Sequence, residues 1–297
     1  MHKTKVKQKT KQLLSSLAKI DKAIQKKQSD NKLLYYNNGE KIHYKQLEFA
    51  KCSLKNRWVF GGNRSGKTEC GAVEVVWLAR GNHPYKKNRN SVSGWVVSLS
   101  REVGRDVAQA KILEYINPSW IKNIVMISGS AQSPKTGIID FITICNVFGG
   151  ISKIGFKSCE MGREKFSGAS LDFVWFDEEP PIEIYQECRM RVLDRCGEIF
   201  GTMTPLLGLT WVYNQIYLNE NCDSQVWHIF MEWDDNPFLD KSEVLALTNT
   251  MSKEELQSRR YGTFLNLGGL VYSEFVENVH VIDTFCVPKE WYCYLSI

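Results

Sequence analysis

The residues best suited to chemistry in this chain form a glycine-rich stretch, Gly61 to Thr68. Its sequence, GGNRSGKT, satisfies the pattern G-x-x-x-x-G-K-[ST], the P-loop or Walker A motif. Backbone N–H groups in such a loop wrap a triphosphate, and the following helix directs its positive dipole end at it. In this pattern Lys67 reaches the β and γ phosphates and Thr68 ligates Mg²⁺. The motif predicts MgATP binding by Gly61, Gly62, Asn63, Arg64, Ser65, Gly66, Lys67 and Thr68.

A run of carboxylates after an apolar strand is the second candidate. The residues 173–176 are continuously apolar and are followed by Asp177, Glu178 and Glu179, more than 100 residues beyond the P-loop. This arrangement is typical of a Walker B motif. We predict that Asp177 holds Mg²⁺ and that Glu178 polarises the water that attacks the γ phosphate. A glutamate beside the Walker B aspartate is typical of P-loop ATPases that hydrolyse ATP to do work.

Two threonines and a glutamine are further candidates. An apolar strand predicted at 198–204 ends in Thr202 and Thr204. In a parallel sheet this strand end can lie beside the γ phosphate, where the hydroxyls would sense it; the alternative is an ordinary pair of threonines between strand and loop. Gln46 precedes the P-loop strand and offers a donor and an acceptor to an adenine edge. Taken alone, it fits an ordinary glutamine on a helix surface.

Strands and helices must alternate to position these residues. Apolar runs predict strands, and helical spacing without proline predicts helices. The strand expected at 138–145 alternates weakly, which indicates an antiparallel or edge element. The pattern favours an α/β fold with a mostly parallel central sheet flanked by helices. The predicted strands are 58–60, 94–100, 124–127, 138–145, 151–156, 173–176, 198–204 and 225–232, and the predicted helices are 69–80, 103–116, 182–193, 209–218, 241–249 and 252–260.

Composition excludes few classes of protein. The 297 residues carry a net charge of +5, which permits a nucleic-acid partner without requiring one. No apolar run is long enough for a transmembrane helix, and the N-terminus lacks the apolar core of a secretory signal. Nine cysteines without a C-x-x-C pair favour free thiols in a reducing compartment.

The first 30 residues predict an amphipathic basic helix. Lysines recur throughout them, and apolar residues recur at helical spacing from Leu13 to Ile24. Such a helix can contact DNA phosphates or a partner subunit. A solvated terminal helix fits the same pattern, so both interpretations stand.

Taken together, these stretches resemble the large terminase subunit of tailed bacteriophages, the ATPase that drives DNA into empty capsids. The resemblance covers roughly Tyr44 to Ile297. It implies a P-loop ATPase fold of the additional-strand, catalytic-glutamate type. The matching parts are Gln46, GGNRSGKT at 61–68, GREKFSGASLDFVWFDEEPP at 162–181, GTMTPLLGLT at 201–210 and RRYGTFLNLGGLVYSEFVENVHVI at 259–282.

The resemblance also implies residue roles. A glutamine ahead of Walker A contacts adenine in that family, which implies this role for Gln46. A short threonine-containing strand end couples hydrolysis to movement, which implies that role for Thr202 and Thr204. Arg64 matches a position where the family often has a catalytic arginine. Arg163 is the candidate for an arginine finger donated to a neighbouring subunit, with a surface helix residue as the alternative. Further arginine candidates are Arg189, Arg191 and Arg195.

The implied partners are double-stranded DNA, a small terminase subunit and a portal protein on which copies of the chain form a homo-oligomeric ring. No membrane partner is expected, and the implied location is the cytoplasm of the bacterial host. The alternatives are another P-loop ATPase of the helicase-like or remodelling kind and an inactive prophage remnant that binds nucleotide only. ATP turnover separates the remnant from the motor.

We expect three segments: a basic helix and linker at 1–40, an ATPase domain at 41–262 with a lid subdomain at about 206–262, and a linker with a first nuclease strand at 263–297. Members of the family carry a C-terminal nuclease of RNase H-like fold. Residues 291–297 resemble its first strand, and the chain ends before the metal-binding aspartate that would follow. Asp283 lies too early to replace it. We therefore expect no nuclease activity from this truncated chain.

Overall fold

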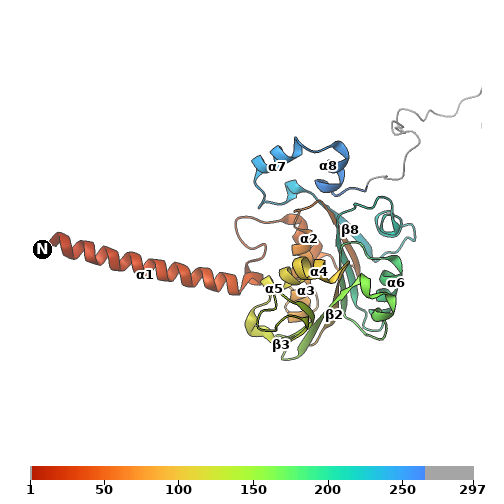
Figure 1. Cartoon of the computed structure of the whole chain (residues 1–297), viewed down its shortest axis with the longest axis horizontal. Helices are drawn as coiled ribbons and strands as arrows, with labels where there is room; N and C mark the ends of the chain where they lie inside the picture. Colours follow the sequence, from red (N-terminus) through yellow and green to blue (C-terminus); the bar gives the residue numbers. More distant parts are fainter. Residues whose placement is uncertain (1, 265–297) are drawn as a thin grey trace, which may run out of the picture. The chain divides into compact units, whose positions relative to one another are not determined.

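An eight-stranded sheet organises the computed structural model, which describes residues 2–264, with the side chains of 2–13, 253 and 254 excepted. The strand order is β3-β4-β5-β2-β6-β7-β1-β8 (Figure 1). The strands from β5 to β8 in this order run parallel, whereas β4 is antiparallel to both β3 and β5. The mostly parallel sheet and the antiparallel strand at 138–145 are confirmed. The strands are β1 (Asn56–Gly61), β2 (Ser93–Ser98), β3 (Ile121–Ser128), β4 (Ile138–Cys145), β5 (Ile151–Ser158), β6 (Phe173–Asp177), β7 (Glu198–Met203) and β8 (Val226–Met231).

The position of β7 decides which motifs meet. β7 lies between β1, which leads into the P-loop, and β6, which ends in Asp177. The register pairs Phe60 with Met203, and Asp177 with Thr202. Because the carboxyl ends of parallel strands lie at one edge of a sheet, the three motifs meet at that edge. A strand inserted between the two Walker strands is the additional-strand arrangement, so the predicted fold type is confirmed.

Helices cover both faces of the sheet. In Figure 1, α2, α3, α4 and α5 lie on one side of it, α6 lies on the other, and α7 and α8 lie above. The segment predicted as one helix at 103–116 consists of α4, a π-helical turn at Arg105–Gln109, and α5. The helices are α1 (His2–Asp30), α2 (Tyr44–Lys51), α3 (Lys67–Arg80), α4 (Arg101–Gly104), α5 (Ala110–Tyr115), α6 (Ile182–Arg191), α7 (Lys241–Thr248) and α8 (Lys253–Arg259).

The P-loop helix α3 is packed between the sheet and α5. Valines along it, such as Val73 and Val76, are fully buried in one apolar core, and Tyr185 of α6 belongs to a second core on the other face. A Cβ on Gly71 would overlap the indole ring of Trp175 in β6, so glycine lets the helix approach the Walker B strand. Gly81, at φ +71°, ends the helix. The helix that follows the P-loop and the strand that ends in Asp177 are thereby packed directly against each other.

Helix α1 differs in its packing from helices α7 and α8. α1 is helical as predicted, but its apolar side chains Leu14, Leu17, Ile20 and Ile24 are exposed. α7 and α8 carry local caps, including a capping box of Ser252 with Glu255. None of the described helices is both long and apolar enough to cross a membrane. The segment predicted as a linker and nuclease strand lies outside the described residues, apart from its first two positions.

Candidate active site

The P-loop joins β1 to α3 by a turn that needs glycine at two points. Gly66 has φ +95°, a left-handed conformation that side chains disfavour. A Cβ on Gly62 would overlap the backbone oxygen of Arg259. The Oγ of Ser65 is buried and has no hydrogen-bond partner within residues 2–264. A buried hydroxyl of this kind inside a glycine-rich loop fits a polar ligand such as a phosphate.

Buried side chains also support the loop from α2 and its N-cap. His43 lies 1% exposed, with its Nε2 2.7 Å from the backbone oxygen of Ser65. Burial lowers the pKa of His43, so the ring is neutral and donates its Nε2 proton to that carbonyl. Gln46 is 2% exposed; its Nε2 donates to the oxygen of Gly66 at 2.9 Å and its Oε1 accepts from Asn37 at 2.8 Å. The surface-glutamine interpretation is therefore wrong, and both polar ends of this amide already have protein partners.

The predicted metal ligands lie side by side. Asp177 is 2% exposed, and its Oδ1 accepts hydrogen bonds from the hydroxyls of Thr68 at 3.3 Å and Thr202 at 3.2 Å. Burial, and then the charge of Glu178, raises the pKa of Asp177 to about 7. One hydroxyl and one carboxylate fit Mg²⁺, which commonly keeps waters and substrate phosphates as its other ligands. No cluster of three or more His, Cys, Asp or Glu residues suited to a metal occurs in the described part of the chain.

Glu178 adopts a strained backbone conformation beside the P-loop lysine. Its φ is +75°, which is rare for a residue with a Cβ. Its N–H donates to the oxygen of Thr202 at 2.9 Å, and its Oε2 accepts from the N–H of Thr204 at 2.9 Å. Its Oε1 lies 3.8 Å from Nζ of Lys67. Burial raises its pKa, against the opposing effect of Lys67, so the site favours a carboxyl that can take up a proton.

The two threonines of β7 and its following loop contact different parts of the site. Thr202 is fully buried; it donates to Asp177 and accepts from Nε1 of Trp175 at 2.9 Å. Thr204 donates its N–H to Glu178, and its Oγ1 lies 3.4 Å from Oδ1 of Asn63 in the P-loop. The end of β7 is therefore bonded to both Walker motifs.

The segment after β8 also contacts the loop, which the sequence did not predict. The Nε1 of Trp233 donates to the oxygen of Asn63, and Nδ2 of Asn236 donates to the oxygen of Arg64 at 2.8 Å. The backbone oxygen of Arg259, at the end of α8, accepts from the N–H of Asn63 at 2.9 Å. A tryptophan and an asparagine far along the chain carried no motif, so only the tertiary structure identifies them.

The candidate arginines lie in different surroundings. Arg64 is exposed in the loop at φ +67°. The side chain of Arg163 is 65% exposed, and its Nε lies 3.2 Å from Glu187. The other three are in ion pairs as well, Arg189 with Asp223, Arg191 with Glu187 and Arg195 with Asp172, and their side chains are less exposed than that of Arg163. Arg64 and Arg163 are thus the candidates whose side chains are most accessible to a ligand or a second chain.

Comparisons with known proteins identify the relatives of this chain. A family model described as the N-terminal part of the large terminase subunit, T4likevirus-type, matches residues 59–279. The large terminase subunit of Salmonella phage P22 is 28% identical over 212 residues, which cover 61% of this chain and 42% of that protein. The relatedness predicted from the motifs is confirmed.

Two solved structures share the fold. The large terminase of a thermophilic bacteriophage superposes with a TM-score of 0.61 at 17% identity, over 82% of this chain and 59% of that one. The ATPase domain of the large terminase of Thermus phage P74-26 gives 0.57 at 18% identity, over 78% and 97%. The chain spans less than two thirds of the first of these structures and of the Salmonella phage protein. Because the family model covers well over half of its residues, the chain belongs to the T4likevirus-type family of large terminase subunits, in which the match falls on the N-terminal part.

Proposed function

We propose that this chain is the ATP-hydrolysing motor part of a DNA-packaging terminase and couples hydrolysis to translocation of double-stranded DNA into a procapsid. The observation that carries the proposal is the meeting of Lys67, Asp177 and Glu178 at one edge of the sheet, with Thr202 and Thr204 bonded to the two acids. The family of the chain and the ADP complex of the large terminase from the thermophilic bacteriophage support nucleotide as its ligand.

In this proposal Lys67 is the group that responds to the γ phosphate. Its ammonium lies 3.8 Å from Glu178. A γ phosphate carries more negative charge than one carboxylate and would draw Lys67 toward itself. Glu178 would then be free to take the proton of the water that attacks the γ phosphorus, as the bond to ADP breaks. The loop residues would hold the rest of the phosphates, and Gln46 would support the loop through its hydrogen bond of 2.9 Å to the oxygen of Gly66.

Mg²⁺ would lie between Thr68 and Asp177 and would neutralise charge on the β and γ phosphates. The buried Asp177 would release its proton to hold the cation, since a nearby divalent charge favours the carboxylate. Thr202 would keep the aspartate oriented by its hydrogen bond of 3.2 Å. These residues form the metal and positioning set of the proposed reaction.

Coupling would run through the end of β7. Thr204 touches the base Glu178 through its N–H and the P-loop through its hydroxyl. Movement of Glu178 during the reaction cycle would therefore move Thr204 and the chain after it. That chain, residues 206–262, is the proposed lid, and it returns to the P-loop through Trp233, Asn236 and Arg259.

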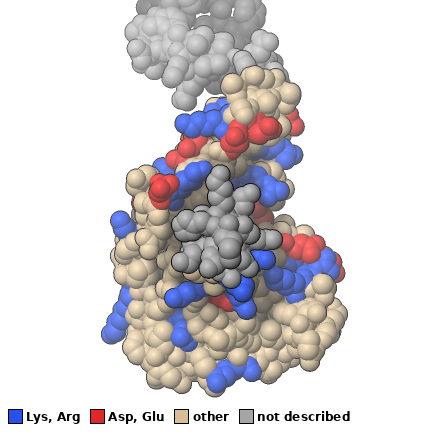
Figure 2. Space-filling view, turned by 90° about the vertical axis from the view of Figure 1, so that its left-hand side faces the viewer, with Lys and Arg blue, Asp and Glu red and all other residues tan. Residues whose placement is uncertain are grey.

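Assembly would complete the site. Arg163 is exposed on the surface, where it could enter the site of a neighbouring copy, and Arg64 would act within its own site. The ring of copies on a portal, the small terminase subunit and the host cytoplasm follow from the family alone. On the face shown in Figure 2, Lys and Arg side chains occur from the top to the bottom of the described surface, with acidic side chains toward its top and right.

The test is the ATPase rate measured against protein concentration, with and without double-stranded DNA, for the wild type and Glu178→Ala. We expect a rate that Glu178→Ala abolishes, that DNA raises, and that increases more steeply than linearly with concentration. Glu160→Ala, which removes an exposed carboxylate elsewhere, is the matched control. Normal MgATP binding with no turnover under any condition would favour the nucleotide-binding remnant, and absence of MgATP binding would refute both.

A further inference from the structure

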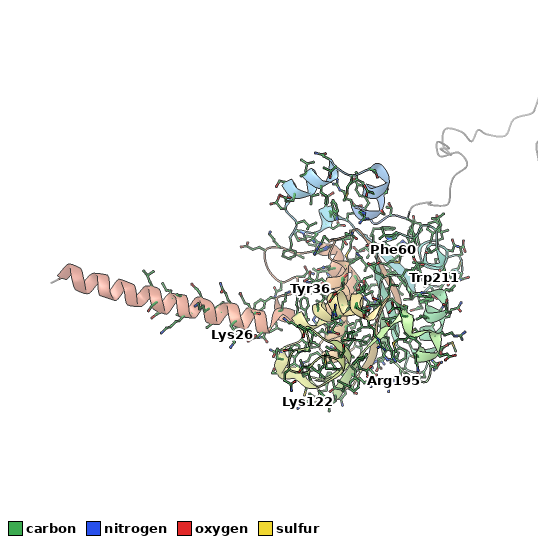
Figure 3. All side chains as sticks on the ribbon, viewed as in Figure 1. Lys26, Tyr36, Phe60, Lys122, Arg195 and Trp211 are labelled. Atoms are coloured by element: carbon green, nitrogen blue, oxygen red, sulfur yellow. The ribbon has the colours of Figure 1, made fainter. Side chains whose placement is uncertain are left out.

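A second cavity lies at the opposite edge of the sheet from the P-loop. It has a volume of about 350 Å³ and lies between the segment before β1, the loop after α3 and the first residues of β6 and β7. These are the amino ends of strands whose carboxyl ends form the candidate active site. In Figure 3, Arg195, beside this edge, and Phe60, beside the P-loop, lie at opposite ends of the domain. The cavity is therefore separate from the nucleotide site.

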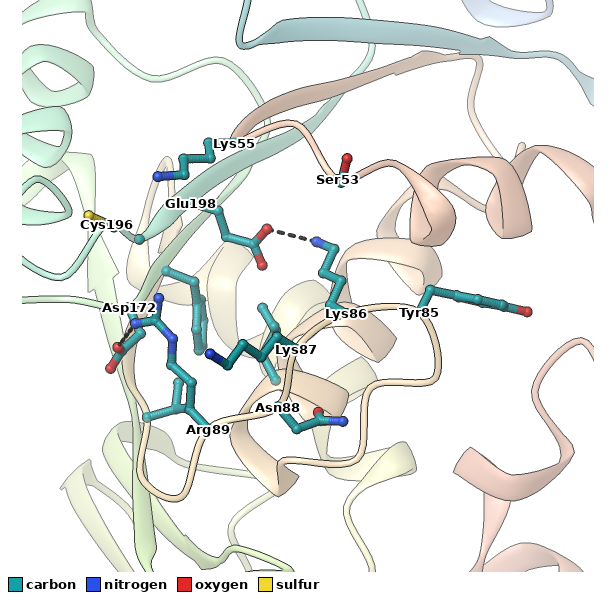
Figure 4. A pocket seen from close by; sticks show the side chains of 14 residues that line it. Ser53, Lys55, Tyr85, Lys86, Lys87, Asn88, Arg89, Asp172, Cys196 and Glu198 are labelled. Carbon is teal, nitrogen blue, oxygen red and sulfur yellow. Dashed lines mark hydrogen bonds and ion pairs between the residues drawn. The ribbon is translucent and has the colours of Figure 1, made fainter.

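Cations dominate the lining of this cavity. Lys55, Lys86, Lys87 and Arg89 line it together with only two carboxylates, Asp172 and Glu198. Figure 4 shows Lys87 and Arg89 extending from one loop toward the strands, with Lys55 and Glu198 on the far wall. The cavity thus gathers four positive charges from two segments that lie more than 30 residues apart in the sequence.

Both carboxylates are already neutralised. Asp172 pairs with Arg89 and Arg195, and it also accepts from the N–H of Ser93 at 2.8 Å. Glu198 pairs with Lys86 at 2.7 Å and with the fully buried Arg57 at 2.9 Å.

No acid is left for the two remaining lysines. Lys55 and Lys87 have no ion-pair partner among residues 2–264. Both lysines are exposed residues that line the cavity, so an anion that enters it meets two cations without acidic partners.

The walls and size of the cavity limit the ligand. Leu78, Val92 and Phe173 supply an apolar wall behind the cations. A volume of about 350 Å³ falls at the lower end of the range for small-molecule sites. A compact anion with at least two charges can contact both of the lysines that lack acidic partners.

We propose that this cavity is a second anion site, which binds a phosphate-bearing small molecule of the pyrophosphate or nucleotide class between Lys55, Lys87 and Arg89. The site does not depend on the P-loop or on the ATPase function proposed above. Lys86 and Glu198 form its inner wall and position the loop that carries Lys87.

The test uses pyrophosphate as the probe in a chain that carries Lys67→Ala, which disables the P-loop as a competing phosphate site. Isothermal titration should give one site with a Kd of about 1 mM or tighter. Adding Lys55→Ala and Lys87→Ala should weaken this binding at least tenfold. The pair Lys122→Ala and Lys135→Ala removes the same charge from exposed positions outside the cavity and should leave the Kd within twofold.

Three outcomes would overturn the proposal. The first is no pyrophosphate binding to the Lys67→Ala chain at 10 times that concentration, about 10 mM. The second is an equal loss from both lysine pairs, which indicates a general charge effect. The third is a loss of duplex DNA binding with unchanged pyrophosphate binding, which assigns the surface to DNA. MgADP binding by Lys55→Ala/Lys87→Ala in the wild-type background reports separately on the P-loop, so failure of the second site and failure of the proposed function are distinguishable.

Discussion

Two buried carboxyls, one near each end of the parallel strands, have opposite electrostatics. Glu74 in α3 is 1% exposed and Asp177 at the end of β6 is 2% exposed. Burial alone would raise the pKa of both. Arg57, Lys86 and His83 nevertheless hold the pKa of Glu74 well below its usual range, whereas burial and Glu178 raise the pKa of Asp177 to about 7. A carboxylate already neutralised by the protein is structural, and one left without a direct cation is available to a ligand.

The difference follows from what each carboxyl touches. Glu74 has ion-pair contacts of 2.8 Å with Arg57 and 2.6 Å with Lys86, and it accepts a hydrogen bond of 3.0 Å from Nε2 of His83, whose Nδ1 accepts from the N–H of Tyr85. Within residues 2–264, the side chain of Asp177 accepts hydrogen bonds only from the two threonine hydroxyls, and Lys67, which lowers its pKa, is paired with the neighbouring Glu178. The protein therefore uses its buried cations for stability at one end of the sheet and leaves a cation site at the other.

The largest expected effect is on stability, and it comes from removing the buried cation that neutralises Glu74. Arg57→Leu leaves Glu74 and Glu198 without their shared buried cation, and it also removes a guanidinium that lies 4.4 Å from the ring centroid of Phe49. Removing one partner of a buried ion pair costs about 3–5 kcal/mol. We expect the free energy of unfolding to fall by that amount in urea titrations followed by circular dichroism. Lys122→Leu, at an exposed site, is the control, and a similar small change in both variants would contradict the assignment.

The next largest effect is on catalysis, and it tests the site of Asp177 and Glu178, where no cation of the described residues neutralises the buried Asp177 directly. Glu178→Gln keeps the shape of the side chain but removes the group that accepts the proton of water. We expect kcat to fall by roughly 10²–10³-fold while MgATP binding stays intact. Glu179→Gln makes the same chemical change at the next residue, which is 9% exposed and has no contact with Lys67 among the described ion pairs. Equal losses in the two variants would show that position 178 has no special role.

The pH dependence of stability distinguishes the two carboxyls, because they should change the free energy of unfolding with pH in opposite directions. The folded pKa of Asp177, about 7, exceeds its ordinary value of 3.8, so the metal-free folded chain binds this proton more tightly than the unfolded chain does. Its contribution therefore makes the free energy of unfolding fall as pH rises from about 4 to 7. The folded pKa of Glu74 is lowered, so its contribution is present above its ordinary value of 4.5 and is lost as pH falls below it.

Unfolding free energies at pH 3, pH 5 and pH 8, without metal, measure these slopes, because the contribution of Asp177 changes between pH 5 and pH 8 and that of Glu74 changes only below its ordinary value of 4.5. Asp177→Asn should stabilise the chain at pH 8 by roughly 1–3 kcal/mol and have little effect at pH 5. Glu74→Gln should destabilise it at pH 8 and lessen the loss of stability seen on acidification. Adding Mg²⁺ with ADP should reverse the Asp177 effect. A parallel response of the two variants would refute the distinction between the sites.

The sequence predicts the site around Asp177 better than it predicts the cluster around Glu74. Walker A, Walker B and the threonine strand end are contiguous, because a loop that wraps phosphates and a strand that ends in carboxylates are local structures. The Arg57 cluster joins residues 17 and 141 positions apart. It forms only because β7 lies beside β1 and α3 packs over both, which no local pattern encodes. Arg57 therefore looks like an ordinary residue at the start of an apolar strand.

The same reason explains what the motifs missed around the P-loop. His43 and Gln46 support the loop from α2 and its N-cap, and Trp233 and Asn236 reach it from a segment about 170 residues later. Each is a single residue whose role depends on a tertiary contact. The family resemblance suggested Gln46 as an adenine contact, but its burial and its two protein partners became visible only in the structure.

The smallest expected effect separates the two threonines. Thr202→Val removes a hydrogen bond that lowers the pKa of Asp177, so the pKa should rise further and Mg²⁺ affinity at pH 7 should fall about fivefold, the equivalent of roughly 1 kcal/mol. Thr204→Val keeps the N–H that bonds Glu178 and loses only the longer contact of 3.4 Å to Asn63. Mg²⁺ titrations followed by a fluorescent ADP should therefore show no change for Thr204→Val. Its expected defect is a smaller stimulation of the ATPase by DNA, because the link from β7 to the P-loop is weakened while the catalytic acids remain in place. A drop in Mg²⁺ affinity in both variants would mean that the strand end acts as one structural unit and that the two hydroxyls have no separate tasks.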